Sequence, residues 1–354
     1  MPEPKRLVRP RLNLALQGGG SHGALTWGVL DALLEDGQWH IDGISGTSAG
    51  AMNAVALAHG FAQAAKAHRD PEDAHLQGCA MAREALAQLW DGVGAMGSLT
   101  WGTPLSAANP LMGLMSQWWS PYQTNPLGFN PLRKLLERVV DFDSLQECNG
   151  HTASHERSGI PKVFVCATNV RTGRGEIFSG QRLSADAVMA SACLPMVFKA
   201  VEIDGECYWD GGYSGNPALH PLIYSTEACD ILLVQINPIE HRELPDTAAQ
   251  IIERMNEVTF NASLLAELRA IDFVRKLLAA GKLDASTYKN VLMHRIDGGA
   301  VLAPFGADSK SRSDTSFLRE LFALGRTAGT DWMARHRKDV GVRPSLQIAD
   351  NAEP

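Results

Sequence analysis

The sequence predicts an α/β protein built on a mainly parallel sheet. Short apolar runs of strand length alternate with longer segments in which apolar residues recur at helical spacing. Two units of strand, glycine turn and helix also follow one another directly within residues 12–68. Consecutive units of this kind form parallel strands joined by right-handed crossovers, so we expect helices on the faces of the sheet.

The first unit begins with a short apolar run at 12–16, which ends at three consecutive glycines at 18–20. Apolar residues at helical spacing follow until Gly37, where the helix is expected to end. Ser21 lies between the glycines and the helix. We therefore expect Ser21 to cap the helix.

The second unit has a strand at 41–45, a glycine turn at 46–50 and an Ala-rich helix at 51–68. The rest of the chain continues the pattern without a fixed repeat. Further strands are expected at 162–169, 201–209, 229–237 and 290–296, and further helices at 79–91, 130–140, 248–280 and within 311–325.

The composition is that of an ordinary globular protein. Of 354 residues, 45% are apolar and 20% are charged, and 32 basic and 39 acidic residues give a net charge of −7. No block of Lys and Arg stands out, which argues against nucleic acid as the main partner. The six cysteines have no C-x-x-C spacing, so reduced thiols are expected rather than a zinc site or a disulfide scaffold.

A short basic tail, residues 1–11, resembles the start of a signal peptide, but the apolar run after it stops at Gln17. This run is too short for the apolar region of a signal peptide. No stretch approaches the roughly 18 apolar residues that span a bilayer. The expectation is a cytoplasmic protein that contacts membranes, if at all, from their surface.

Residues 92–131 differ from their surroundings, because they have little periodicity and are rich in Gly, Pro, Met and Trp. Four of the eight tryptophans lie in or beside this segment, which makes it a candidate for function. A long irregular apolar insertion serves as a flap or binding loop, or packs over a core or a dimer interface. As a flap it would provide peripheral membrane contact and bind acyl chains.

The first glycine turn, GGGSHG at 18–23, fits two signatures. It matches both the dinucleotide fingerprint G-x-G-x-x-G and the nucleophile elbow G-x-S-x-G. A dinucleotide site requires an acidic residue at the end of the second strand, to bind the ribose hydroxyls. Asp42 lies at the start of that strand instead, so the sequence disfavours a dinucleotide site.

Gly46, Ser48 and Gly50 form a second G-x-S-x-G motif, with a strand before it and a helix after it, as a nucleophile elbow requires. The helix that begins at Ala49 places its positive end beside Ser48, which favours a developing alkoxide. Ser48 is therefore the better candidate nucleophile. The alternative is a serine that only caps the helix in a tight turn.

The first glycine turn then gains a complementary role. Gly18, Gly19 and Gly20 present backbone N–H groups without side chains in the way, as an oxyanion hole does. Adjacent parallel strands would place both turns at the same edge of the sheet, where α/β proteins bind ligands.

Asp210 is the candidate base. It follows the predicted strand at 201–209 and precedes Gly211 and Gly212. Because these neighbours are small, the Asp210 carboxylate can approach a neighbouring loop. D-G-G is also a common turn, and a purely structural role is equally open for this residue taken alone.

The three motifs together resemble the patatin-like phospholipase family, which has a G-G-G-x-[RK]-G loop, a G-x-S-x-G serine and a D-G-[GA] aspartate in this order. The resemblance spans about residues 12–237 and includes ASACLP at 190–195 and the stretch at 215–217. It implies a three-layer α/β/α sandwich that hydrolyses acyl esters of lipids without a metal or other cofactor.

The resemblance also implies residue roles. Ser48 would attack the ester carbonyl, Asp210 would act as general base, and the amides of 18–20 would bind the oxyanion. His22 departs from the family pattern, because it stands where Arg or Lys is usual. A neutral residue there favours weaker activity or less anionic esters.

Residues 238–354 lie outside the strongest resemblance and are expected to complete the same domain with helices and one strand. Three functional alternatives remain open. A Ser–His–Asp hydrolase would use His220 or His294, which follow Ser48 in chain order. An acyltransferase would pass the same acyl group to an alcohol other than water, and a non-catalytic lipid-binding protein would retain only the fold.

Overall fold

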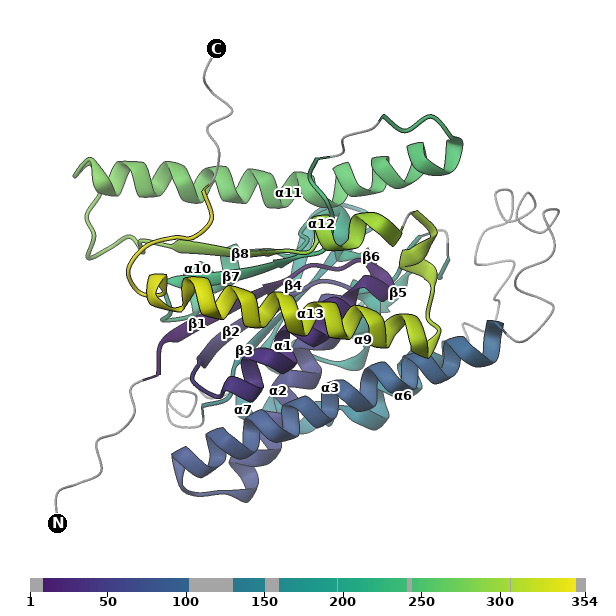
Figure 1. Ribbon diagram of the computed structural model, residues 1–354, viewed down its shortest axis with the longest axis horizontal. Coiled ribbons are helices and arrows are strands. Elements are labelled where there is room, and N and C mark those ends of the chain that lie inside the picture. Colours follow the sequence, from purple (N-terminus) through teal and green to yellow (C-terminus); the bar gives the residue numbers. More distant parts are fainter. Residues whose placement is uncertain are drawn as a thin grey trace.

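The computed structural model describes residues 9–101, 130–149, 159–195, 197–240, 244–305 and 307–347. Its eight-stranded sheet has the order β5-β6-β3-β2-β1-β7-β8, with β4 paired to β3 (Figure 1). The strands are β1 (Arg11–Leu16), β2 (His40–Gly46), β3 (Lys162–Asn169), β4 (Gly175–Phe178), β5 (Val201–Ile203), β6 (Glu206–Asp210), β7 (Asp230–Gln235) and β8 (Leu292–Asp297).

The centre of the sheet is parallel, as the sequence predicts. Strands β3, β2, β1, β7 and β8 run in one direction, whereas β4 and β6 are antiparallel to β3, and β5 is antiparallel to β6. The helices are α1 (Gly23–Asp36), α2 (Ala49–Ala67), α3 (Pro71–Trp101), α6 (Pro131–Val139), α7 (Phe142–Asn149), α9 (Ala185–Ser191), α10 (His220–Ser225), α11 (Ala248–Ala279), α12 (Gly299–Leu302) and α13 (Thr315–His336).

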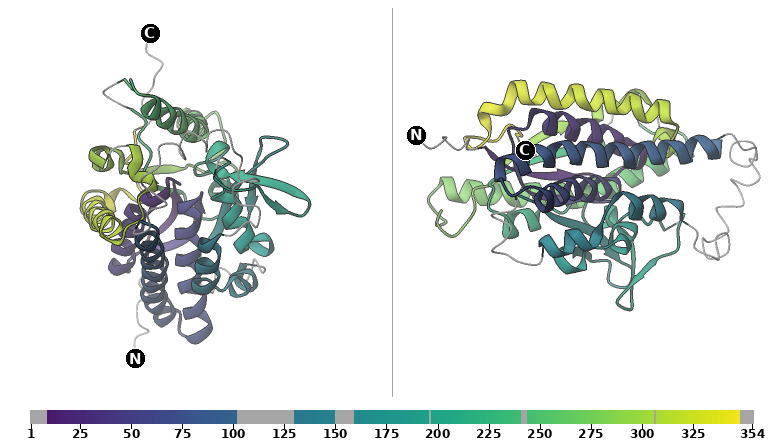
Figure 2. Two further views of the ribbon diagram at one scale, coloured as in Figure 1. Left: turned by 90° about the vertical axis from the view of Figure 1, so that its right-hand side faces the viewer. Right: turned by 90° about the horizontal axis from the view of Figure 1, so that it is seen from below.

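Both faces of the sheet are covered, which gives the expected three-layer sandwich (Figures 1 and 2). Along β1, Leu14 and Leu16 belong to the larger apolar core, which includes α1, α2, α3 and α13, whereas Ala15 belongs to a smaller core with α10 and α11. This alternation follows from the two-residue side-chain period of a strand. It explains why the strands are apolar throughout.

The C-terminal region is part of these same layers. Strand β8 pairs with β7, and α13 packs along α1. The two helices approach closely at a pair of glycines, since a Cβ at Gly28 would lie 2.0 Å from the Phe322 carbonyl oxygen and one at Gly325 would lie 2.0 Å from the Leu25 carbonyl oxygen. Residues 238–354 therefore supply one strand and a helix on each face.

Two sequence expectations are wrong in detail. The predicted strand at 201–209 is a hairpin, β5–β6, which turns at Asp204 and Gly205 with φ of 55° and 78°. The predicted irregular segment at 92–131 begins too early, because α3 continues as a helix through Trp101. The stretch at 102–129 lies outside the described residues, and its proposed lipid contact stays a prediction.

Two details near the N-terminus, the length of the tail and the role of Ser21, also differ from expectation. The predicted tail at 1–11 is shorter, because Arg11 begins β1 and Arg9 Nε donates a 3.0 Å hydrogen bond to the Gly37 carbonyl oxygen. Ser21 is not a side-chain cap, since a 3-10 turn at Gly20–His22 leads into α1 and neither helix start has a side-chain cap. Residues 1–8 lie outside the described part of the chain.

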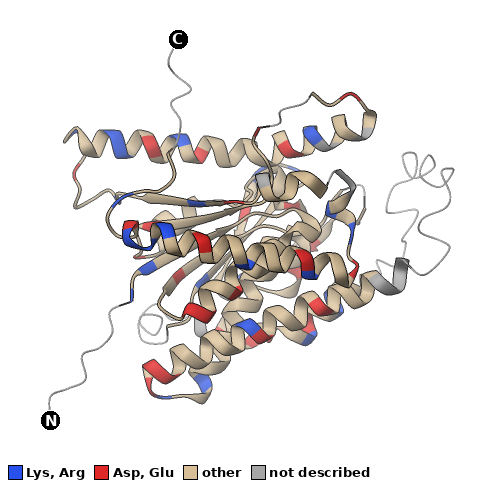
Figure 3. Ribbon diagram, in the orientation of Figure 1, with Lys and Arg blue, Asp and Glu red and all other residues tan. Residues whose placement is uncertain are grey.

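Charges of both signs are interspersed along the helices (Figure 3). Within the described ranges, no helix is both long enough and apolar enough to span a bilayer.

Candidate active site

The sheet register brings the three motifs to one level. Leu16 of β1 pairs with Gly46 of β2, and Gly46 pairs with Val165 of β3. Gly18 and Ser48 each follow two residues after these paired positions. Asp210 pairs with Ala167, which is also two residues beyond Val165. The glycine turn, the serine and the aspartate therefore lie at one edge of the sheet, although 192 residues separate the first from the last (210 − 18).

Ser48 has the strained backbone of a nucleophile elbow, with φ 54° and ψ −120°. The turn is too tight for other residues at the flanking glycines. A Cβ at Gly46 would lie 2.5 Å from the Gly50 carbonyl oxygen, and one at Gly50 would lie 2.2 Å from the Leu16 carbonyl oxygen. The Ser48 amide donates to Ser191 Oγ at 2.9 Å, which fixes the elbow against α9.

Asp210 is 1% exposed, and the Ser48 side chain lies close enough to its carboxylate to act on its pKa. Its Oδ1 also accepts the Gly212 amide at 2.7 Å. Burial raises the pKa of Asp210 to about 7, although the Gly212 amide and the Ser48 side chain favour the charged form and lower it. A carboxylate with this pKa can accept and return a proton near neutral pH.

The glycine turn contacts this pair directly. A Cβ at Gly18 would lie 2.7 Å from Ser48 Cβ, so only glycine allows the two turns to meet. The Gly18 amide, however, donates to Asn216 Oδ1 at 2.7 Å. The expectation that all three glycine amides face an oxyanion is therefore wrong for Gly18. Gly19 and Gly20 remain the candidate donors.

Buried amide side chains hold the base of the glycine turn. Asn237 Nδ2 donates to the Gly18 carbonyl oxygen at 2.6 Å. Gln17 Oε1 accepts from the Ile236 and Asn237 amides, each at 2.9 Å, and Gln17 Nε2 donates to Asn261 Oδ1 at 3.0 Å.

Sequence reasoning did not assign these supporting residues. Gln17 directly follows an apolar strand run and Asn237 is the last residue of another, whereas Asn216 and Ser191 lie in stretches noted only for their family resemblance. A polar residue immediately after a buried strand was the available signal, because such a residue must find a hydrogen-bond partner inside the protein.

His22 is also buried, with 4% exposed. Its Nε2 lies 2.7 Å from Ser309 Oγ. Burial, aided by the positive charge of Lys310, lowers the pKa of His22 to about 3. His22 is therefore a neutral hydrogen-bonding residue and not a replacement for the cation usual at this position.

Neither candidate histidine contacts Ser48. His294 lies on β8, three strands from β2, where its ring nitrogens contact Asp230 Oδ1 at 2.9 Å and Ser345 Oγ at 3.0 Å. His220 is exposed and lies 3.8 Å from Glu267 Oε1. Both have partners elsewhere, so the Ser–His–Asp alternative has no geometric support.

Asp42 does not serve a dinucleotide either. Its Oδ2 accepts the amides of Glu227 and Ala228, at 2.6 and 2.7 Å. This contact lies at the start of β2, at the opposite end of the strand from the glycine turn.

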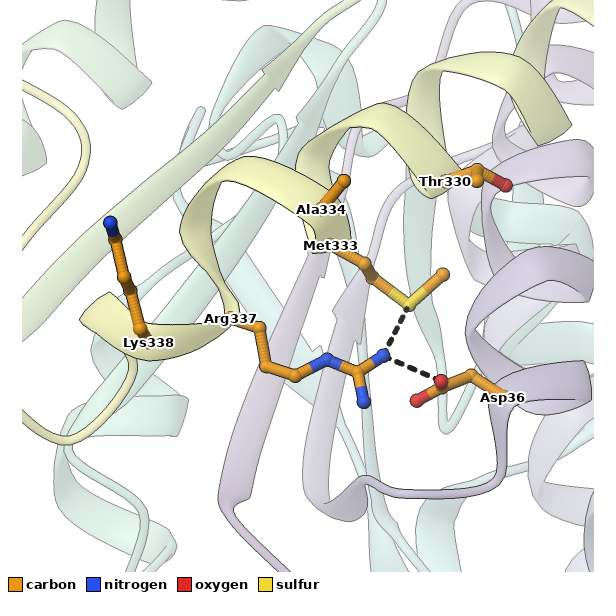
Figure 4. A pocket seen from close by; sticks show the side chains of 6 residues that line it. All are labelled: Asp36, Thr330, Met333, Ala334, Arg337 and Lys338. Carbon is orange, nitrogen blue, oxygen red and sulfur yellow. Dashed lines mark hydrogen bonds and ion pairs between the residues drawn. The ribbon is translucent and has the colours of Figure 1, made fainter.

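A surface pocket between the end of α1 and α13 lies away from these residues (Figure 4). Asp36 and Arg337 form an ion pair across it at 2.5 Å. Asp36 is 13 residues from Gly23, so helix α1 separates this pocket from the glycine turn by about 20 Å. In the described parts of the chain, no cluster of three or more His, Cys, Asp or Glu is arranged to hold a metal ion.

All three motifs lie within the region that one protein-family model matches. The model of the patatin-like phospholipase family matches residues 14–223, well over half of the chain. The chain belongs to the patatin-like phospholipase family. Membership of this family supports lipid acyl hydrolysis as the general activity of the protein. A search of curated proteins finds no match.

Solved structures also resemble this patatin-like chain, at low similarity. VipD from Legionella pneumophila is 15% identical with a TM-score of 0.36, over 91% of this chain and 67% of that one. ExoU, in its heterodimeric complex with SpcU from the type III secretion system of Pseudomonas aeruginosa, is 20% identical with a TM-score of 0.31, over 96% and 73% of the two chains.

Proposed function

We propose that the protein is a serine acyl hydrolase of the phospholipase A or lysophospholipase type, which cleaves carboxylic ester bonds of lipids through an acyl-enzyme on Ser48. Asp210 is the general base. The observation that carries the proposal is the placement of the Ser48 side chain and the buried Asp210 carboxylate at the same level of the sheet as the glycine turn, with Ser48 close enough to act on the pKa of Asp210.

In the first half-reaction, Ser48 Oγ attacks the ester carbonyl carbon and transfers its proton to Asp210. The carbonyl oxygen becomes an oxyanion and accepts hydrogen bonds from the Gly19 and Gly20 amides. The carbon–oxygen bond to the leaving alcohol then breaks, and Asp210 returns the proton to that alcohol. The acyl group stays on Ser48 as an ester.

In the second half-reaction, water attacks the Ser48 ester while Asp210 accepts a proton from it. Collapse of the second tetrahedral intermediate releases the fatty acid and returns the proton to Ser48. Two features support a catalytic role over lipid binding alone. Burial of Asp210 disfavours its charged form, and the Ser48 backbone is strained. Both features are typical of active sites.

The first test combines active-site labelling with single and double variants. A fluorophosphonate should label the wild-type protein at Ser48 but not Ser48→Ala, because an unactivated serine reacts negligibly. Ser48→Ala and Asp210→Asn should each reduce ester hydrolysis at least about 1,000-fold, and the double variant should be little worse, because the two residues act as a unit. Ser225→Ala, at the exposed end of α10, is the matched serine control.

Labelling of Ser48→Ala, or additive losses in the double variant, would contradict the pair. A panel of phospholipids, lysophospholipids and short-chain esters then identifies the preferred ester. Transfer of the acyl group to an added alcohol in preference to water would identify an acyltransferase with the same acyl-enzyme.

A further inference from the structure

The glycine turn is held on its far side by a segment from the C-terminal region. A short 3-10 helix at Ala307–Ser311 lies against it. Gly20 has φ 59°, and a Cβ there would lie 2.4 Å from the Lys310 carbonyl oxygen. The turn therefore lies between Ser48, which Gly18 contacts, and Lys310, which Gly20 contacts.

This placement matters because the backbone amides proposed as oxyanion donors belong to glycines, which do not fix their own conformation. Glycines have the greatest backbone freedom of any residue, and oxyanion donors must be placed to within about 0.5 Å. Gly18 is fixed by hydrogen bonds from and to asparagine side chains. The carbonyl oxygens of Gly19 and Gly20, which carry the proposed donors, accept hydrogen bonds from the His22 and Gly23 amides of the same turn. Towards other segments these two glycines are bounded by packing, against Ile236 and Lys310.

Lys310 is in turn anchored to helix α11. Its Nζ lies 3.1 Å from Oε1 of Glu257, which is 3% exposed. The second carboxylate oxygen of Glu257 lies 3.3 Å from Arg254, which also donates to the Pro238 and Ile239 carbonyl oxygens. A buried carboxylate shared by two cations favours the arrangement that keeps both ion pairs, because losing a charged partner is costly where water is excluded.

A second tie joins the same segment to the turn. Ser309 Oγ lies 2.7 Å from His22 Nε2, and both side chains are buried. Nδ1 of His22 has no hydrogen-bond partner in the described structure, so the contact with Ser309 is its main polar interaction there. Ser309, Lys310 and Glu257 all lie outside the matched family region at 14–223.

We propose that Lys310, anchored by Glu257, is a positioning residue for the oxyanion turn, so that the C-terminal region completes the active site. The inference rests on the proposed function of the Gly19 and Gly20 amides. Lys310 acts through its backbone contact with Gly20, and Glu257 sets where that backbone lies.

The test compares Lys310→Met, which keeps the alkyl chain but removes the charge, with Lys310→Arg, which keeps the charge. Steady-state kinetics are measured on a soluble short-chain ester, together with inhibition by a trifluoromethyl ketone, which forms an oxyanion adduct with an active-site serine. We expect Lys310→Met to lower kcat about tenfold or more, with KM changed less than about twofold, and to weaken the inhibitor by a similar factor. Lys310→Arg should restore most of this loss.

Two further variants make the test specific. Lys338→Met removes an exposed lysine beside the pocket of Figure 4 and should leave kcat unchanged. Glu257→Gln removes the anchor but keeps its shape, and should lower kcat like Lys310→Met, with the double variant no worse than either. Thermal melting of each variant gives its folded fraction. If Lys310→Met does not fold, Glu257→Gln takes its place as the variant without the ion pair, and Lys310→Arg remains the variant that keeps it.

Hydrogen exchange separates this inference from the proposed function, because it needs no activity. A peptide covering residues 17–25 should exchange faster in Lys310→Met or Glu257→Gln than in the wild-type protein. Unchanged exchange, or a loss of kcat that equals the loss of folded protein, would overturn the positioning role. Failure of Ser48 labelling together with faster exchange would overturn the proposed function, while showing that Lys310 still orders the glycine turn.

Discussion

At the scale of single residues, the site depends on opposing effects on Asp210. Burial penalises its charged form, whereas the Gly212 amide and the Ser48 side chain stabilise that form. The first effect is larger, and the pKa rises to about 7. An exposed aspartate would remain ionised at this pH but would bind a proton too weakly to act as an efficient base.

This pKa predicts the pH dependence of the reaction. Below pH 7 Asp210 is protonated and cannot accept the Ser48 proton, so kcat/KM should rise with pH, be half-maximal near pH 7 and reach a plateau above it. Initial rates on a soluble neutral ester across pH 5 to 9 measure this profile. A profile flat from pH 5 upward would mean that the base titrates at the pKa of an ordinary aspartate.

At the scale of elements, the strand-to-helix turns are built from glycines that touch other backbone. The second turn illustrates the constraint, because Gly46 and Gly50 lie against each other and against the end of β1. These contacts place the start of α2 beside the glycine turn and orient Ser48. Strain in the Ser48 backbone is retained because the surrounding contacts leave no alternative.

Gly50→Ala should therefore damage both stability and activity. The added methyl group would meet the Leu16 carbonyl oxygen at 2.2 Å, so β1 and α2 must separate. We expect the free energy of unfolding to fall by about 2 kcal/mol or more, measured by urea denaturation, and kcat to fall with it. Gly175→Ala is the control, because the nearest atoms to its methyl group would be side-chain atoms, Ser214 Oγ at 3.1 Å and Cys166 Sγ at 3.5 Å. Equal stability of the two variants would contradict this packing.

The prediction from sequence was most reliable for long elements. Alternating apolar runs and helical spacing located the five parallel strands and α1, α2, α11 and α13. Short elements such as β4, α9 and α10 were missed, because four to seven residues contain too few periods to be recognised. The extension of α3 to Trp101 was missed because its glycines pack against neighbouring residues, and the sequence does not record those contacts.

At the scale of the whole molecule, the first and last thirds of the chain form one structure. Helix α13 packs on α1, β8 extends the sheet from β7, and α11 covers the face opposite α1. Ion pairs from Arg326 to Asp31 and Glu35 join α13 to α1 as well. A family match that ends at residue 223 therefore covers only part of the folding unit.

This interdependence predicts that a chain ending at residue 240 does not fold. It would expose the core face of α1 and the apolar side of the sheet that α11 covers. We expect loss of the cooperative thermal transition and of near-ultraviolet circular dichroism. A chain ending at residue 347, which keeps every described element, should melt like the full-length protein. A cooperative transition in the shorter chain would instead indicate two independent domains.

The sequence alone determined the type of fold, the family resemblance and the candidate residues, because glycine placement, apolar period and motif order are local properties. Tertiary structure decided which groups meet. The sheet register brings Ser48 and Asp210 to one level. The Gly18 amide donates its hydrogen bond to Asn216 Oδ1. Lys310 contacts Gly20 of the glycine turn, although the two residues are 290 positions apart (310 − 20). These contacts depend on how distant elements pack against each other, and no local pattern in the chain encodes that packing.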